Sequence, residues 1–133
     1  MLPFENMSGD AAQEYFADGM VEDIITAPVD SRMFAWQYYI ALAHLLAGRY
    51  DEATSWAERA LRDNPNMSSP GRVAAVSHAL AGRLPDARQI MERIGKLDPD
   101  LRLSNLGDLL PPFRRAEDRA RYVEGLRRAG LPE

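Results

Sequence analysis

A stretch of 23 residues in the middle of the chain occurs twice, and the second copy begins 34 residues after the first. When residues 44–66 are aligned with residues 78–100, nine positions are identical. They are His, Leu, Ala, Gly, Arg, Ala, Glu, Arg and Pro, in that order. A repeat of this period is typical of helix–turn–helix units that stack on one another and share a continuous core. The chain is therefore predicted to fold as stacked helical hairpins.

Each copy has a glycine at the place where its hairpin should turn. Gly48 and Gly82 can adopt the left-handed backbone conformation that ends a helix, at less cost than residues with a Cβ. Asp51 is a candidate N-cap for the helix after the first turn. The predicted helices span residues 32–47, 52–63, 69–81 and 85–97.

Small residues occupy equivalent places in the two copies. Ala41 and Ala53 in the first copy correspond to Ala75 and Ala87 in the second. We expect the two helices of each hairpin to approach closely at these alanines. A larger side chain there would force the helices apart at a cost of ~1–3 kcal/mol.

A further amphipathic helix is predicted before the repeats, over residues 11–27. Phe16, Met20 and Ile24 recur every four residues and form one apolar stripe. This helix either covers the outer face of the first hairpin within its own chain or contacts a second chain. Trp36, near the start of the repeats, would suit such a contact between chains.

The residues after the repeats do not follow the 34-residue pattern. Residues 101–110 predict a short helix, and residues 115–129 predict a longer one that ends at Gly130. We expect this part to cap the stack. The predicted fold class is therefore all-α, with an N-terminal acidic segment and helix (residues 1–28) followed by a hairpin domain with its C-terminal cap (residues 29–133).

Charge is distributed unevenly along the chain, although the net charge is only −4. Residues 1–27 contain six acidic residues and no basic ones, so that the remaining residues carry a net charge of +2. The two regions would attract each other, within a chain or between chains, over roughly a Debye length of ~8–10 Å. Two separate solvated faces would explain the same pattern, and both interpretations stay open.

Composition argues against several kinds of site. The absence of cysteine excludes disulfides and thiolate metal sites, and no run of eighteen apolar residues could span a membrane. His44 and His78 occupy equivalent positions, where a repeated packing role is favoured over a metal or pH-sensitive site because no carboxylate or thiolate set accompanies them. No catalytic residue, cofactor or metal is predicted, and we expect a cytoplasmic protein.

Arginines are concentrated in the last predicted helix. Glu117, Asp118 and Glu124 alternate with them, which favours a solvated helix with internal ion pairs over a nucleic-acid-binding face. The arginines are Arg114, Arg115, Arg119, Arg121, Arg127 and Arg128.

The repeated residues resemble the tetratricopeptide repeat family. When Pro65 and Pro99 are placed at the closing proline of that family, the alanines, the glycines and Tyr50 fall at its small and aromatic positions. The early tryptophan position of the family instead holds Gln37 and Gly71. The resemblance covers residues 34–101, and it implies binding of a peptide or helix on a concave face lined by the first helix of each hairpin.

The residues that would line this face are mostly apolar. Arg72 is the only charged residue among them, so we expect an apolar groove rather than a clamp for a terminal carboxylate. The set consists of Tyr38, Leu42, Leu45, Arg72, Val76 and Ala79.

The two ends of the chain resemble a narrower group, the bacterial adenylate/guanylate cyclases that contain tetratricopeptide repeats. The similar segments are residues 2–10, 14–26 and 121–133. In that group an α/β domain continues after the position of Ala27, whereas here the first repeat follows Pro28 almost at once and no cyclase domain is recognised. The resemblance thus implies a signalling-associated module without cyclase activity.

These observations favour a non-enzymatic protein-interaction or scaffold module in bacterial signalling, which binds a protein partner or forms a homodimer and binds neither nucleic acid nor membrane. The alternative is a nucleotide-sensing accessory of a cyclase-type signalling protein. A third hypothesis is a remnant of a larger gene that folds but binds nothing.

Overall fold

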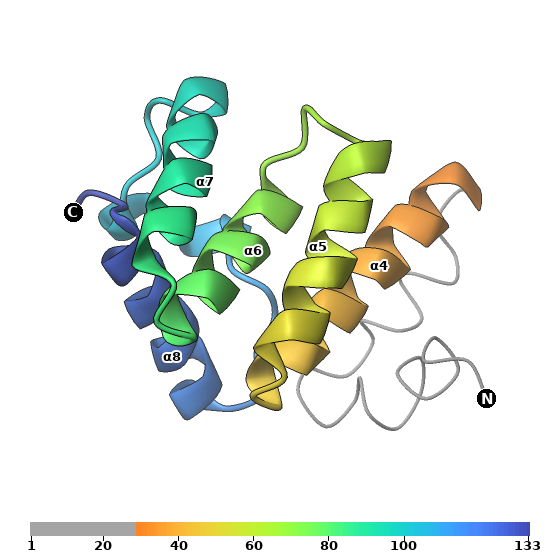
Figure 1. Ribbon diagram of the computed structural model, residues 1–133, viewed down its shortest axis with the longest axis horizontal. Helices are drawn as coiled ribbons and strands as arrows, with labels where there is room; N and C mark the ends of the chain where they lie inside the picture. Colours follow the sequence, from red (N-terminus) through yellow and green to blue (C-terminus); the bar gives the residue numbers. More distant parts are fainter. Residues whose placement is uncertain (1–28) are drawn as a thin grey trace.

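The computed structural model describes residues 29–133, and helices dominate this part of the chain (Figure 1). The described helices are α4 (Val29–Leu46), α5 (Tyr50–Asp63), α6 (Ser69–Leu80), α7 (Leu84–Leu97) and α8 (Ala116–Ala129), with the short 3₁₀ helices η1 (Leu103–Asn105) and η2 (Gly107–Leu109) between α7 and α8. The predicted all-α class with two hairpins and a C-terminal helix is confirmed. The predicted helix over residues 11–27 lies outside the described residues.

The two hairpins stack side by side through α5 and α6. Helix α4 pairs with α5, and α6 pairs with α7. Helix α6 also contacts α4 and α8, so it touches every other α-helix in the described part of the chain. This central position makes α6 the element on which the packing converges.

The sequence of α6 fits its position because it has no polar face. All residues from Pro70 to Ser77 are buried. The Ser77 hydroxyl is satisfied within the helix, where it donates to the Val73 carbonyl at 2.8 Å. Gly71 lies where a Cβ would come within 3.3 Å of Ile94, so a glycine lets α7 pack closely. By contrast, α5 and α7 are apolar only on the face that they bury.

The alanines act as the sequence predicts. Ala41, Ala53, Ala75 and Ala87 are completely buried between the helices of the two hairpins. Since a fully buried Ala leaves no room for a larger side chain, these four positions determine how closely each pair of helices approaches.

Both hairpin turns end their first helix in the same way. Gly48 has a φ of 83°, and its N–H donates to the Leu45 carbonyl at 3.0 Å. The Arg49 N–H donates to the His44 carbonyl at 2.8 Å, which completes a Schellman motif. The turn at Gly82, with a φ of 86°, repeats both bonds.

The predicted N-cap at Asp51 is wrong. Helix α5 begins at Tyr50, and the preceding Arg49 makes no side-chain cap. Asp51 therefore lies in the first turn of the helix, where Thr54 Oγ1 donates to its carbonyl at 2.9 Å. The Schellman motif leads the chain into α5 without a side-chain cap.

Residues 101–110 do not form the predicted single helix. They form two separate 3₁₀ turns, because side chains and the C-terminal tail hydrogen-bond to the backbone of this segment. The Asn105 side chain accepts from the Arg102 N–H at 2.8 Å, and the Leu103 N–H donates to the Pro132 carbonyl at 2.8 Å. Gly107, the first residue of η2, has a φ of 23°, which departs from helical geometry.

The turn geometry predicts opposite effects for two glycine-to-alanine substitutions. Gly82→Ala should lower the free energy of unfolding by ~1–2 kcal/mol, because φ stays positive where a Cβ is disfavoured. Gly95→Ala, within α7 and with no atom within 4 Å of the position that a Cβ would take, should raise it by ~0.5–1 kcal/mol. Urea denaturation of the full chain measures both, and equal effects would contradict the proposed role of Gly82.

Candidate helix-binding face

The C-terminal helix α8 packs against α6 and reaches the end of α4. Its amino-terminal half lies near the carboxyl end of α4, whereas its carboxyl end lies beside that of α7. Helix α8 thus packs mainly on α6, makes a smaller contact with α7, and reaches the carboxyl end of α4 through Arg121.

Arg121 fixes the amino-terminal half of α8 on this face. Its Nη1 donates to the Leu46 carbonyl at 3.2 Å, and its Nη2 lies 3.5 Å from the Leu45 carbonyl. The last carbonyls of a helix lack partners within the helix and form the negative end of its dipole. A guanidinium therefore binds there through hydrogen bonds and charge together.

Gly125 allows α8 to approach α6 closely. A Cβ at this position would lie 2.5 Å from Val76 Cγ1 and 3.3 Å from the Val76 backbone. Since such distances are too short for carbon atoms, only glycine fits here in the observed arrangement. The requirement for a small residue makes the face selective for particular helices.

Tyr122 fills the centre of the contact and is only 1% exposed. Its ring packs on Phe113, with centroids 5.4 Å apart, and its phenol interacts electrostatically with Arg72 of α6. Burial raises the pKa of the Tyr122 phenol, and Arg72 opposes this shift. Burial also raises the pKa of Tyr38 well above its usual value, with Tyr122 adding to the rise.

Arg72 is a buried cation, only 4% exposed, beneath α8. Its Nη1 donates to Ser68 Oγ at 2.8 Å, and the phenols of Tyr38 and Tyr122 lie within its electrostatic reach. Among the described residues no carboxylate forms an ion pair with it. Within this part of the chain, the face thus combines apolar surface with one positive charge that lacks a counter-ion.

The structure brings together the six residues predicted to line the face. Tyr38 is partly buried, and the other five are buried in the arrangement that includes α8: Leu42, Leu45, Arg72, Val76 and Ala79. Their predicted partner-binding role stays a prediction. Of the residues predicted for self-association or groove cover, Trp36 is 7% exposed on α4, whereas Phe16, Met20 and Ile24 lie outside the described residues.

Sequence reasoning misses the contribution of α8 to this face. The sequence pattern places Tyr122 on the apolar face of the predicted helix over residues 115–129, but it places Arg121 in a solvated arginine cluster and does not identify Gly125 as a contact residue. The available signal is a glycine inside a predicted helix, four residues after an arginine. The expected internal ion pairs of this helix do occur, because Glu124 pairs with both Arg127 and Arg128.

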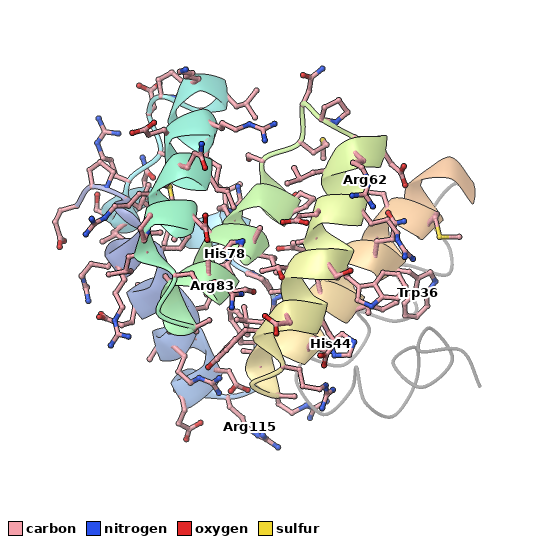
Figure 2. The ribbon with its side chains drawn as sticks, in the orientation of Figure 1. Trp36, His44, Arg62, His78, Arg83 and Arg115 are labelled. Atoms are coloured by element: carbon pink, nitrogen blue, oxygen red, sulfur yellow. The ribbon has the colours of Figure 1, made fainter. Side chains whose placement is uncertain are left out.

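The two histidines have the same environment at the two turns (Figure 2). Arg49 Nε donates to His44 Nδ1 at 2.9 Å, and Arg83 Nε donates to His78 Nδ1 at 2.9 Å. Burial, together with the adjacent arginine, lowers the pKa of each histidine. The packing role of the histidines therefore includes a hydrogen bond that closes each turn.

One ion pair links the two turns. Arg83 Nη1 lies 3.1 Å from Asp51 Oδ1, so that the second turn contacts the start of α5 in the first hairpin. No group of three or more His, Cys, Asp or Glu side chains that could hold a metal occurs in residues 29–133. Within the same range no helix is both long and apolar enough to cross a membrane.

Stacked helical hairpins that present their first helices as a common face define a helical-repeat protein of the interaction type. The profile of the tetratricopeptide repeat family matches residues 36–108, more than half of the chain. The chain belongs to the tetratricopeptide repeat family. Such repeats generally mediate protein–protein interaction.

A short segment is similar to a known bacterial protein. Over 26 residues the chain is 73% identical to a putative adenylate cyclase 3 of Rhizobium meliloti (strain 1021). The similar segment covers 20% of this chain and 4% of the length of that protein. No solved structure is significantly similar to the chain.

The lowered pKa values of the histidines predict that acid destabilises the fold. Between the unfolded pKa of about 6.5 and the lower folded values, the unfolded chain binds more protons than the folded chain. The free energy of unfolding should therefore fall as the pH decreases from 7 to about 5. In the variant His44→Asn/His78→Asn, whose amide oxygens can still accept from the arginines, this decrease should be smaller. An unchanged pH dependence by urea denaturation would contradict this explanation.

The close approach at Gly125 predicts a local effect of substitution. Gly125→Ala should overpack the contact with Val76, at a cost of ~1–3 kcal/mol, and loosen α8. Hydrogen exchange followed by mass spectrometry should then show lower protection in residues 116–129 than in α5. Gly95→Ala is the matched control, because nothing lies within 4 Å of its Cβ position. Equal loss of protection in α5 and α8 would argue against a separate α8 contact.

Proposed function

We propose that this protein is a non-enzymatic interaction module that binds a helix on the face of α4 and α6, where Tyr38, Leu42, Leu45, Arg72, Val76 and Ala79 lie. One observation supports the proposal: the α6 side of this face, together with the carboxyl end of α4, already holds a helix of the chain itself, α8. A surface that binds one amphipathic helix has the shape and the apolar area to bind another, in the helix-in-groove mode.

Three contacts determine which helices fit. The last carbonyls of α4 accept hydrogen bonds, as they do from Arg121, and Val76 requires a small residue opposite to it. Arg72 favours an electron-rich or acidic side chain, because its charge is buried without a counter-ion among the described residues. A partner helix needs a small residue at its centre and a polar or acidic group nearby.

We also propose that the protein acts in bacterial signalling, in the cytoplasm. The 26-residue similarity to a putative adenylate cyclase supports it.

We further propose that the chain forms homodimers, to which Trp36 and the apolar stripe of residues 11–27 contribute. Light scattering on the full chain tests this point, and a monomer at all concentrations would contradict it. The nucleotide-sensing alternative instead predicts micromolar nucleotide binding in calorimetry.

A disulfide between α6 and α8 tests whether partners use the face. The chain has no cysteine, so Val76→Cys/Gly125→Cys introduces a single pair. A Cβ at Gly125 would lie 3.2 Å from that of Val76, slightly less than the about 3.5–4.5 Å found in disulfides. When oxidised, this variant should hold α8 in place and exclude a partner helix.

The reduced form of the same variant is the matched control. Proteins captured from an extract of the source cell by the reduced form, and lost after oxidation, would be ligands of the face. The same proteins captured equally by both forms would show that partners bind elsewhere, and the proposal would be wrong.

A further inference from the structure

The contact between α8 and its face contains two buried polar atoms without hydrogen bonds. Asp118 Oδ2 and Tyr122 Oη have no partner of normal geometry within residues 29–133, although Arg72 interacts electrostatically with the Tyr122 phenol. A buried polar atom that lacks a partner loses its hydration without compensation. A helix with apolar side chains at these two positions would therefore suit the face better than α8 does.

The chain contains such a sequence near its other end. Residues 16–20 read Phe-Ala-Asp-Gly-Met, and residues 122–126 of α8 read Tyr-Val-Glu-Gly-Leu. Both segments have the pattern aromatic, apolar, acidic, glycine, apolar. Aligned in this way, residues 11–25 correspond to residues 117–131, with an offset of 106 positions.

The alignment places apolar side chains at both positions, although in α8 the other carboxylate oxygen of Asp118, Oδ1, lies 3.9 Å from Arg121 Nη1. Where α8 buries Asp118 and Tyr122, the earlier segment has Ala12 and Phe16. Gly19 corresponds to Gly125, which meets the steric demand of Val76. The fit at the centre is thus equal in size and more apolar.

Two positions differ in charge. Tyr15 replaces Arg121, so the hydrogen bonds to the carboxyl end of α4 would be lost. Asp23 replaces the buried Ala129, which lines a groove of about 430 Å³ whose charged residues are Arg88, Arg102, Glu92 and Asp98. An acidic side chain there would meet two basic and two acidic neighbours, so charge at this position favours neither helix.

The connection to α4 decides which copy supplies the segment. Residues 26–28 alone separate the aligned segment from Val29, the first residue of α4. The four Cα–Cα steps from residue 25 to Val29 span at most ~14 Å. Helix α6 packs against both α4 and α8, so a helix in the place of α8 lies up to two interaxial distances from α4, each ~8–10 Å. The link is short for this span, which favours a segment from another chain.

We propose that residues 11–27 of a second copy bind to the α4–α6 face in place of α8. The two copies then exchange an acidic helix for a basic one at the same site. This inference rests on the proposed helix-binding role of the face, and it specifies the partner as this chain itself.

Crosslinking between two full-length variants tests the alignment directly. A Val76→Cys chain mixed with a Gly19→Cys chain should form a disulfide between copies under mild oxidation. Asp18→Cys is the matched control, because the residue it aligns with, Glu124, lies away from Val76 and pairs with Arg127 and Arg128. We expect at least about tenfold less crosslinking with this control.

Mixing a Val76→Cys chain with a Gly125→Cys chain tests whether the second copy supplies α8 rather than residues 11–27. If this pair crosslinks between copies and the Gly19→Cys pair does not, the second copy supplies α8, and the inference is overturned while the proposed face is retained. If neither pair crosslinks and the oxidised lock also leaves partner capture unchanged, the inference and the proposed function both fail.

A peptide experiment avoids any dependence on the folding of the variants. A synthetic peptide of residues 10–27, added in excess to the unmodified full chain, should compete for the face and lower the molar mass from dimer to monomer in light scattering. The same peptide with Gly19→Leu should compete about tenfold less well or worse, because its side chain would overlap Val76. Equal competition by the two peptides would overturn the inference.

Discussion

The packing of the described chain depends on α6, in which all residues from Pro70 to Ser77 are buried. A helix that contacts four others leaves little surface for solvent, so its buried positions must fit more than one neighbour. Gly71 provides space for Ile94 of α7, and Val76 faces Gly125 of α8. A change in the size of a side chain in α6 therefore alters the packing of both hairpins and of α8. By contrast, α5 and α7 retain a solvated face that tolerates substitution.

The 34-residue repeat predicts the two hairpins because the repeated residues have roles in local structure. Gly48 and Gly82 mark turns that need a positive φ, and the paired alanines mark close helix contacts. The starts of the helices are less predictable. At Asp51 a favourable capping residue is present, but the turn geometry begins the helix one residue earlier, at Tyr50. Residues 101–110 show the same limit, because their leucines suggest a helix while contacts with the distant C-terminal tail divide it.

The place of α8 cannot be predicted from periodicity. Its helical pattern is evident in the sequence, but its position results from long-range contacts of Arg121 and Gly125 with two other helices. For the same reason the sequence identifies the six face residues on their helices but not their burial beneath α8. The histidines illustrate a similar point. Their repetition is visible in the sequence, but only the turn geometry shows that an arginine donates a hydrogen bond to Nδ1 of each ring.

The ion pair between Asp51 and Arg83 gives the stack a direction. Arg83 of the second hairpin contacts an acidic residue of the first, but the position equivalent to Asp51 in the second hairpin is Pro85. A longer array made by copying the first hairpin would repeat this contact at each junction, and one made by copying the second would not. The two copies are thus similar enough to stack but not interchangeable at this junction.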